Sequence, residues 1–193
     1  YSSWGEIEAT LGNVSVARRV FAEGREVAGH TDAQYMRRWA LFEKKNSASE
    51  VTTRELFRES ARLDESDWRT FLLWGQWEKS RGHTERAAEC FAWGAKSRPN
   101  VPFTWQVWAV MEAGLGRPDV ARELFRQGRE KCPNDAPLLM EWALLEEREG
   151  NVEGARALFE QGATLDPPHA PLLHAWADME KSSQGDASQG AGG

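Results

Sequence analysis

The amino-acid sequence predicts an all-α protein, an α-α superhelix built from antiparallel helical hairpins. Three observations predict this fold class: Trp recurs every 34 or 35 residues, a block centred on Phe recurs between the Trp residues, and Gly and Pro fall where the chain must turn. A single hairpin is too small to cover its own large aromatic side chains. We therefore expect the hairpins to stack and to share their aromatic residues.

The first helix of each hairpin is marked by Trp. Six of the ten Trp lie in register: Trp4, Trp39, Trp74, Trp108, Trp142 and Trp176. Gly or Ala follows each one directly, and Glu lies four residues after it, at Glu8, Glu43, Glu78, Glu112, Glu146 and Glu180. Apolar spacing of three and four residues indicates amphipathic helices. We place these first helices at residues 1–11, 33–46, 67–80, 101–114, 135–149 and 169–182.

The second helix of each hairpin is marked by Phe. This residue follows the registered Trp by 17 or 18 positions, at Phe21, Phe57, Phe91, Phe125 and Phe159. A small residue lies four positions before each Phe and another lies three positions after it, so one helix face allows close approach of a neighbouring backbone. We place the second helices at residues 14–28, 50–62, 84–97, 118–131 and 152–164.

Turn residues separate these helices. Four Gly lie between the Trp and Phe blocks, where a positive φ is useful, and three Pro lie eight residues after a Phe, where Pro ends the second helix. Residues 1–181 are therefore expected to form about five hairpins plus a final helix, and the Ser/Gly-rich segment 182–193 is expected to be disordered. The chain begins with Tyr1, so we expect it to be a fragment of a longer array whose targeting signal is unreadable.

Composition restricts the function classes. The formal charge of −6 and the pI near 5.4 argue against indiscriminate attraction to nucleic acid or to an anionic membrane. Cys90 and Cys132 fall in different repeats and are expected to be reduced thiols, with Cys90 at a core position. The His residues lack zinc-ligand spacing, and no phosphate-binding loop or nucleophile motif is present. We expect no catalytic site, metal, cofactor, membrane span or small-molecule substrate.

The motifs resemble a known repeat. Trp108-Ala-Val-Met-Glu112 with Ala121-Arg-Glu-Leu-Phe125, and the corresponding segments from Trp142 and Ala155, resemble the half-a-tetratricopeptide (HAT) repeat over residues 1–181. These motif sequences are most similar to those of the chloroplast factors that mature and stabilise photosystem II mRNA. Two hairpins depart from the pattern, with Ala88 in place of Arg and Thr53-Arg54 in place of Ala-Arg.

The resemblance implies a scaffold in RNA metabolism. The expected role is binding of single-stranded RNA along the concave face, to stabilise or process a transcript, with the chloroplast as the expected location and the nucleus as the alternative. The alternative role is a protein–protein interaction scaffold of a splicing or ribosomal RNA processing complex without direct RNA contact. The acidic net charge favours this alternative, since phosphate neutralisation normally supplies much of the affinity for RNA.

The repeated charges are interpreted as architectural, because a residue present in every hairpin serves the repeat and not one site. We predict that Glu and Arg pair across each hairpin as Glu8–Arg18, Glu43–Arg54, Glu112–Arg122 and Glu146–Arg156. The registered Trp39, Trp74, Trp108, Trp142 and Trp176 are assigned to the core for the same reason.

If the fold resembles tetratricopeptide solenoids, the first helices line the concave face. The cations at the non-core positions of these helices are then candidate RNA-binding residues: Arg37, Lys44, Lys45, Arg69, Lys79, Arg148 and Lys181. Trp68 and Trp105 are conceivable stacking partners for bases. The alternative is that the cations form an ordinary solvated face and that both Trp serve packing.

Overall fold

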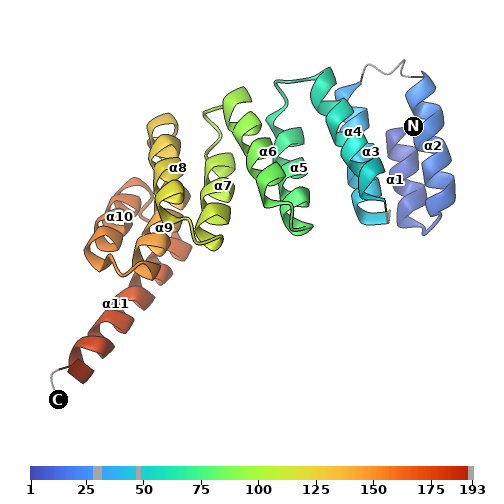
Figure 1. The fold of residues 1–193 in the computed structure, drawn as a ribbon. Helices are drawn as coiled ribbons and strands as arrows, with labels where there is room; N and C mark the ends of the chain where they lie inside the picture. Colours follow the sequence, from blue (N-terminus) through green and yellow to red (C-terminus); the bar gives the residue numbers. More distant parts are fainter. Residues whose placement is uncertain (28–31, 47–48, 191–193) are drawn as a thin grey trace. The chain divides into compact units, whose positions relative to one another are not determined.

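The structure, a computed structural model, describes residues 1–27, 32–46 and 49–190, and these contain eleven α-helices and no β-strand (Figure 1). The prediction of an all-α fold is confirmed. The helices are α1 (Ser2–Thr10), α2 (Val14–Val27), α3 (Ala33–Asn46), α4 (Glu50–Leu63), α5 (Trp68–Ser80), α6 (Thr84–Ser97), α7 (Pro102–Gly114), α8 (Pro118–Lys131), α9 (Ala136–Arg148), α10 (Val152–Leu165) and α11 (Ala170–Gly190).

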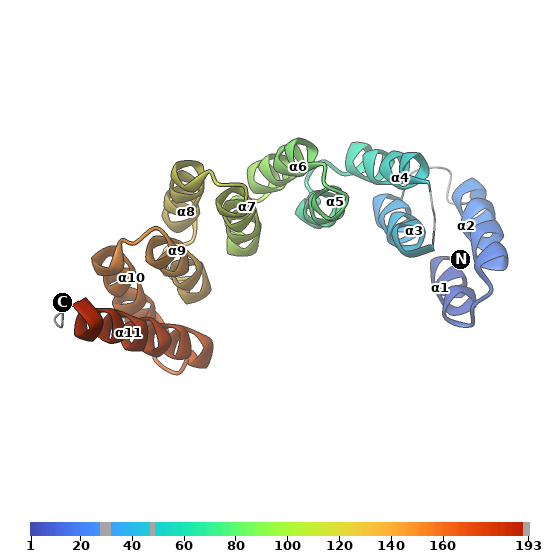
Figure 2. The same cartoon turned by 60° about the horizontal axis from the view of Figure 1, so that its bottom comes forward.

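The chain forms two compact units, Tyr1–Arg98 with helices α1 to α6 and Pro99–Gly193 with helices α7 to α11. Within each unit, successive helices pair as antiparallel hairpins. Figure 2 shows the second helices of a unit on one side of its first helices: α2, α4 and α6 in the first unit, α8 and α10 in the other. Each unit therefore consists of a layer of Trp-bearing helices against a layer of Phe-bearing helices.

The hairpin turns are specified by Gly with positive φ. Gly12 and Gly150 have φ of 84° and 80°, a conformation that costs Gly little and other residues more. The amide of the next residue then donates to the carbonyl of the repeated Glu, at 2.8 Å both from Asn13 to Glu8 and from Asn151 to Glu146. This pattern satisfies a carbonyl that the helix end would otherwise leave without a partner.

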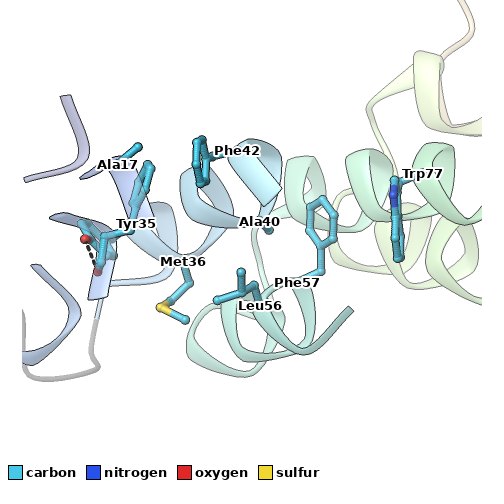
Figure 3. Packing of buried hydrophobic residues seen from close by; sticks show 9 residues of the cluster. Ala17, Tyr35, Met36, Ala40, Phe42, Leu56, Phe57 and Trp77 are labelled. Carbon is cyan, nitrogen blue, oxygen red and sulfur yellow. Dashed lines mark hydrogen bonds between the residues drawn. The ribbon is translucent and has the colours of Figure 1, made fainter. Parts of the chain in front are cut away.

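The core of each unit is built from Phe rings and the registered Trp. Phe21 and Phe57 are fully buried and stack on Trp39 and Trp74, with ring centroids 6.0 and 6.2 Å apart. Each Trp belongs to the hairpin that follows its Phe partner along the chain. Figure 3 shows the buried residues against which Trp39 and Trp74 pack, among them Phe57 of α4 and Trp77 of α5. The predicted sharing of aromatic residues between hairpins is confirmed within each unit.

The last helix differs from its prediction. We expected it to end near residue 182 before a disordered tail, whereas α11 continues to Gly190, and residues 191–193 lie outside the described part. Once a packed segment has nucleated a helix, each further residue adds one backbone bond without a new nucleation cost. The hydroxyls of Ser182 and Ser183 also donate to the carbonyls of Asp178 and Met179, so Ser is compatible with the helix here.

Candidate functional site

Arg–Glu ion pairs join consecutive hairpins. The guanidinium of an Arg in one second helix binds the carboxylate of the Glu in the next first helix. The shortest N–O distances are 3.0, 2.7, 2.9 and 2.7 Å for the pairs Arg18–Glu43, Arg54–Glu78, Arg122–Glu146 and Arg156–Glu180. Each Arg precedes Phe by three residues and thus shares its helix face. The predicted pairing inside each hairpin is therefore wrong. The Arg lies on the same helix face as Phe, and this face packs against the next hairpin.

In four of the first helices the repeated Glu is a buried structural charge: Glu43, Glu78, Glu112 and Glu146. In Glu146, the carboxylate accepts hydrogen bonds from the Trp142 indole at 3.0 Å and from the Asn151 amide at 3.0 Å, besides those from Arg122. Burial raises the pKa of Glu146, but the bonds from Arg122, Asn151 and Trp142 outweigh it, and the pKa lies below its ordinary value. The group is thus held ionised as part of the packing between hairpins.

The fourth hairpin satisfies its Glu in another way. The preceding second helix carries Ala88 where the others carry Arg. Glu112 binds Arg117, in the turn of its own hairpin, with an N–O distance of 2.7 Å. This pair uses the loop position that Asn151 occupies in the fifth hairpin.

Arg37 and Lys181, two of the candidate RNA-binding cations, are partly neutralised. Arg37 forms a largely buried ion pair with Asp67, and burial lowers the pKa of the guanidinium. Lys181 lies 3.5 Å from Asp178 on the surface of α11. Arg37 is therefore not available to a phosphate, whereas Lys181 stays exposed in a surface ion pair.

The other candidates differ in their surroundings. The exposed lysines Lys44, Lys45 and Lys79 lie in the last turns of α3 and α5, and no described carboxylate forms an ion pair with them. Arg69 lies over the Trp68 ring, with its guanidinium carbon 4.8 Å from the ring centroid. In the second unit, Arg148 donates to the Leu144 carbonyl at 3.3 Å. Among the candidates, Lys44, Lys45, Lys79 and Arg69 thus lie in the first unit without a described ion pair, and Arg148 lies in the second.

The two conceivable stacking residues serve other contacts. Trp105 is 7% exposed, its indole donates to the Pro99 carbonyl at 2.9 Å, and its ring stacks on Trp108. The proposal that Trp105 stacks on bases is thus wrong, because a buried ring offers no face to a ligand. Trp68 is half-buried and carries Arg69 over its ring.

A groove that the sequence reasoning missed lies between α4 and α6, with α5 beneath it. It encloses about 310 Å³, and its lining includes Arg58, Phe71, Arg86, Glu89 and Trp93. A signal for it exists in the sequence. The position two residues after Phe holds Glu or Gln in every other hairpin and Trp93 here, and the position five before Phe holds Val, Thr or Gly elsewhere and Arg86 here.

Comparisons with known proteins show a similarity to tetratricopeptide repeats. A tetratricopeptide repeat family model matches residues 102–145. The crystal structure of MamA matches with a TM-score of 0.66 at 12% identity, over 86% of this chain and 96% of that chain. PilF of Pseudomonas aeruginosa matches with a TM-score of 0.66 at 16% identity, over 99% of this chain and 86% of that chain.

A third structure, YrrB, described as a TPR protein with an unusual peptide-binding site, has a TM-score of 0.61 at 14% identity, over 90% of this chain and 88% of that chain. At such identities the likeness concerns the fold. No curated protein matches the sequence. Within the described residues, no helix is both long and apolar enough to cross a membrane, and no group of His, Cys, Asp or Glu is arranged to hold a metal ion.

Proposed function

We propose that this chain, a tetratricopeptide-like repeat protein, is a protein-interaction scaffold that binds an acidic segment of a protein partner on the first helices of residues 1–98. The observation that carries the proposal is the unpaired charge of Lys44, Lys45 and Lys79. Four Arg–Glu pairs of the repeat are used between hairpins, whereas these lysines have no such role. Lys at a helix C-terminus is also compatible with the helix dipole, so the fold tolerates it there.

The choice of a protein partner rests on charge and on the fold. A chain with a net charge of −6 repels an extended phosphate backbone outside its local basic patches. Arg37, which would have extended the patch, is neutralised by Asp67. One solved structure of the same fold, YrrB, is described as having a peptide-binding site, which makes peptide binding a reasonable expectation for this surface.

Single-stranded RNA is the second candidate ligand, and the same lysines favour it, because they form a positive surface free of internal ion pairs. In this version the chain stabilises or processes an organellar transcript, with the chloroplast as the proposed location and the nucleus as the alternative. The alternative scaffold role in an RNA-processing complex requires no RNA contact by the chain itself.

Fluorescence anisotropy distinguishes these functions. The probes are a fluorescein-labelled peptide of alternating Glu and Gly and a labelled oligouridine, each titrated with the wild-type chain and with the triple variant K44E/K45E/K79E. We expect the wild type to bind the peptide, and the variant to bind it at least about tenfold more weakly. A matched control is R19E/R129E/K131E, which makes the same change in net charge on second helices.

The outcomes separate cleanly. Peptide binding that is lost in the lysine variant and kept in the control supports the protein scaffold. If the wild type binds only oligouridine and the lysine variant does not, RNA is the ligand of these lysines. If neither probe binds the wild type, or if the control variant loses binding equally, these lysines do not form the binding site.

A further inference from the structure

The groove between α4 and α6 contains residues that the repeat does not require. All of its lining belongs to helices α4, α5 and α6 of the first unit. Two of its residues, Arg86 and Trp93, occupy positions where every other hairpin has a different kind of side chain. A repeated residue is explained by hairpin stacking, whereas these two need another explanation.

Trp93 is an exposed aromatic ring that is held in place. Its side chain is 54% exposed, although the equivalent residues are the polar Glu23, Glu59, Gln127 and Gln161. The ring stacks on the buried Phe71 with a centroid distance of 6.5 Å and an interplanar angle of 21°. The ammonium of Lys96 lies 4.9 Å from the centroid of the Trp93 ring. An apolar surface ordered before a ligand arrives loses little conformational entropy on binding.

Positive charge exceeds negative charge in the groove. Arg54 is occupied by Glu78 and Glu50, so it adds no unpaired charge. Arg58 and Arg86 are exposed, and no described carboxylate forms an ion pair with either guanidinium. Glu89 is the acidic residue of the lining. The groove thus places two unpaired guanidinium groups beside an aromatic ring. This arrangement can bind a ligand that carries an anionic group next to an apolar group.

We propose that this groove binds a short segment of a protein partner in which an aromatic side chain lies next to a carboxylate. The aromatic ring packs against Trp93 and the edge of Phe71, and Arg58 and Arg86 bind the carboxylate. The groove is a second contact surface, on the side of the second helices, and it does not depend on the lysines of α3 and α5.

A protein segment fits better than RNA. Proteins that bind single-stranded nucleic acid without sequence preference present successive aromatic rings along a continuous basic groove. Here one ring is offered, since the neighbouring second helices carry Glu59 and Glu23 at the equivalent positions. Neither Glu offers a ring on which a second base could stack, and one hollow of about 310 Å³ accommodates a single large side chain.

The probe for this site is a fluorescein-labelled peptide of sequence Gly-Glu-Phe-Asp-Gly, titrated by anisotropy with the full chain. The test variants are W93Q and R86V. Both install residues that other hairpins carry at those positions, Gln127 and Val120, so the fold is expected to persist. We expect each variant to bind the peptide about tenfold more weakly than wild type. Q127A, at the Trp93-equivalent position in the second unit, is the control and keeps wild-type affinity.

Peptide variants complete the test. Replacing the peptide's Phe by Ala, or its acids by Gln and Asn, is expected to reduce binding by a similar factor. The proposal is overturned if W93Q binds the peptide as tightly as the wild type, or if replacing the peptide's acids leaves its affinity unchanged. It is also overturned if the wild type does not bind the peptide or binds oligouridine more tightly. Circular dichroism melting curves of both variants establish that a loss of binding is not a loss of fold. K44E/K45E/K79E is expected to retain this binding, which distinguishes a failure here from a failure of the proposed function.

Discussion

Glu8 in α1 and Glu146 in α9 accept hydrogen bonds from the same two kinds of neighbour. Glu8 binds the Trp4 indole at 3.1 Å and the Asn13 amide at 2.9 Å, as Glu146 binds Trp142 and Asn151. Glu146 also binds Arg122 from the preceding hairpin, whereas no described Arg forms an ion pair with Glu8.

The consequence is visible three residues after each Trp. Ile7 is 58% exposed, whereas Leu145 at the same repeat position is 1% exposed. The hydrogen bonds from Trp and Asn to the repeated Glu therefore form within one hairpin. The burial of the Glu and its ion pair with Arg come from the preceding hairpin. We infer that a neighbouring hairpin supplies stability to this cluster that a single hairpin cannot provide.

The largest expected effect comes from removing the shared aromatic ring. In W142A, the stacking on Phe125 at 6.0 Å and the bond to Glu146 are both lost, and the free energy of unfolding should fall by about 3 kcal/mol. W4A removes the same side chain from an exposed position and should cost about 1 kcal/mol or less. Urea unfolding followed by circular dichroism measures both. Equal losses would locate the stabilising energy within a single hairpin.

A smaller effect is expected from removing the Arg that spans two hairpins. R122A leaves the buried Glu146 carboxylate without its bidentate partner, and this should cost about 2 kcal/mol. R126A is the matched control on the same helix, because Arg126 pairs with Glu123 in its own helix on the surface and should contribute far less than Arg122. Chemical denaturation of the two variants gives the comparison, and a cost for R126A as large as that for R122A would contradict it.

The pH dependence of stability should distinguish the two Glu as well. Because the pKa of Glu146 lies below its ordinary value of 4.5 in the folded state, its contribution is fully present above that value and is lost as pH falls through the folded pKa. The melting temperature of the wild type should therefore drop below about pH 5, and less steeply in E146Q. Asn13 and Trp4 also lower the pKa of Glu8, but without an Arg, so E8Q should change the curve less. If the melting temperatures of E146Q and wild type depend on pH identically, the Arg122–Glu146 ion pair does not contribute to stability.

The same comparison explains what the sequence could predict. The register of Trp, Phe and Gly determines where helices begin and turn, and nearly all predicted boundaries lie within two residues of the structure. The partner of Arg122 could not be predicted from spacing, because Glu112 of its own hairpin and Glu146 of the next both occupy the repeated Glu position. The choice between them depends on which helix face packs against the next hairpin. The α4–α6 groove was missed since three helices contribute to it, although Trp93 departs visibly from the repeat.

The smallest expected difference concerns the turns, which are local to each hairpin. G12A and G150A place a Cβ at φ of 84° and 80°, in open space, so backbone strain alone should destabilise each by about 1 kcal/mol. The cost should be the same in both hairpins, because no neighbouring hairpin contributes to the turn. G114A is the control: this Gly lies in α7 without positive φ or a nearby atom, and Ala there should stabilise the helix by about 0.5 kcal/mol. A cost for G150A well above that for G12A would mean that the turn, like the Trp cluster, depends on the hairpin before it.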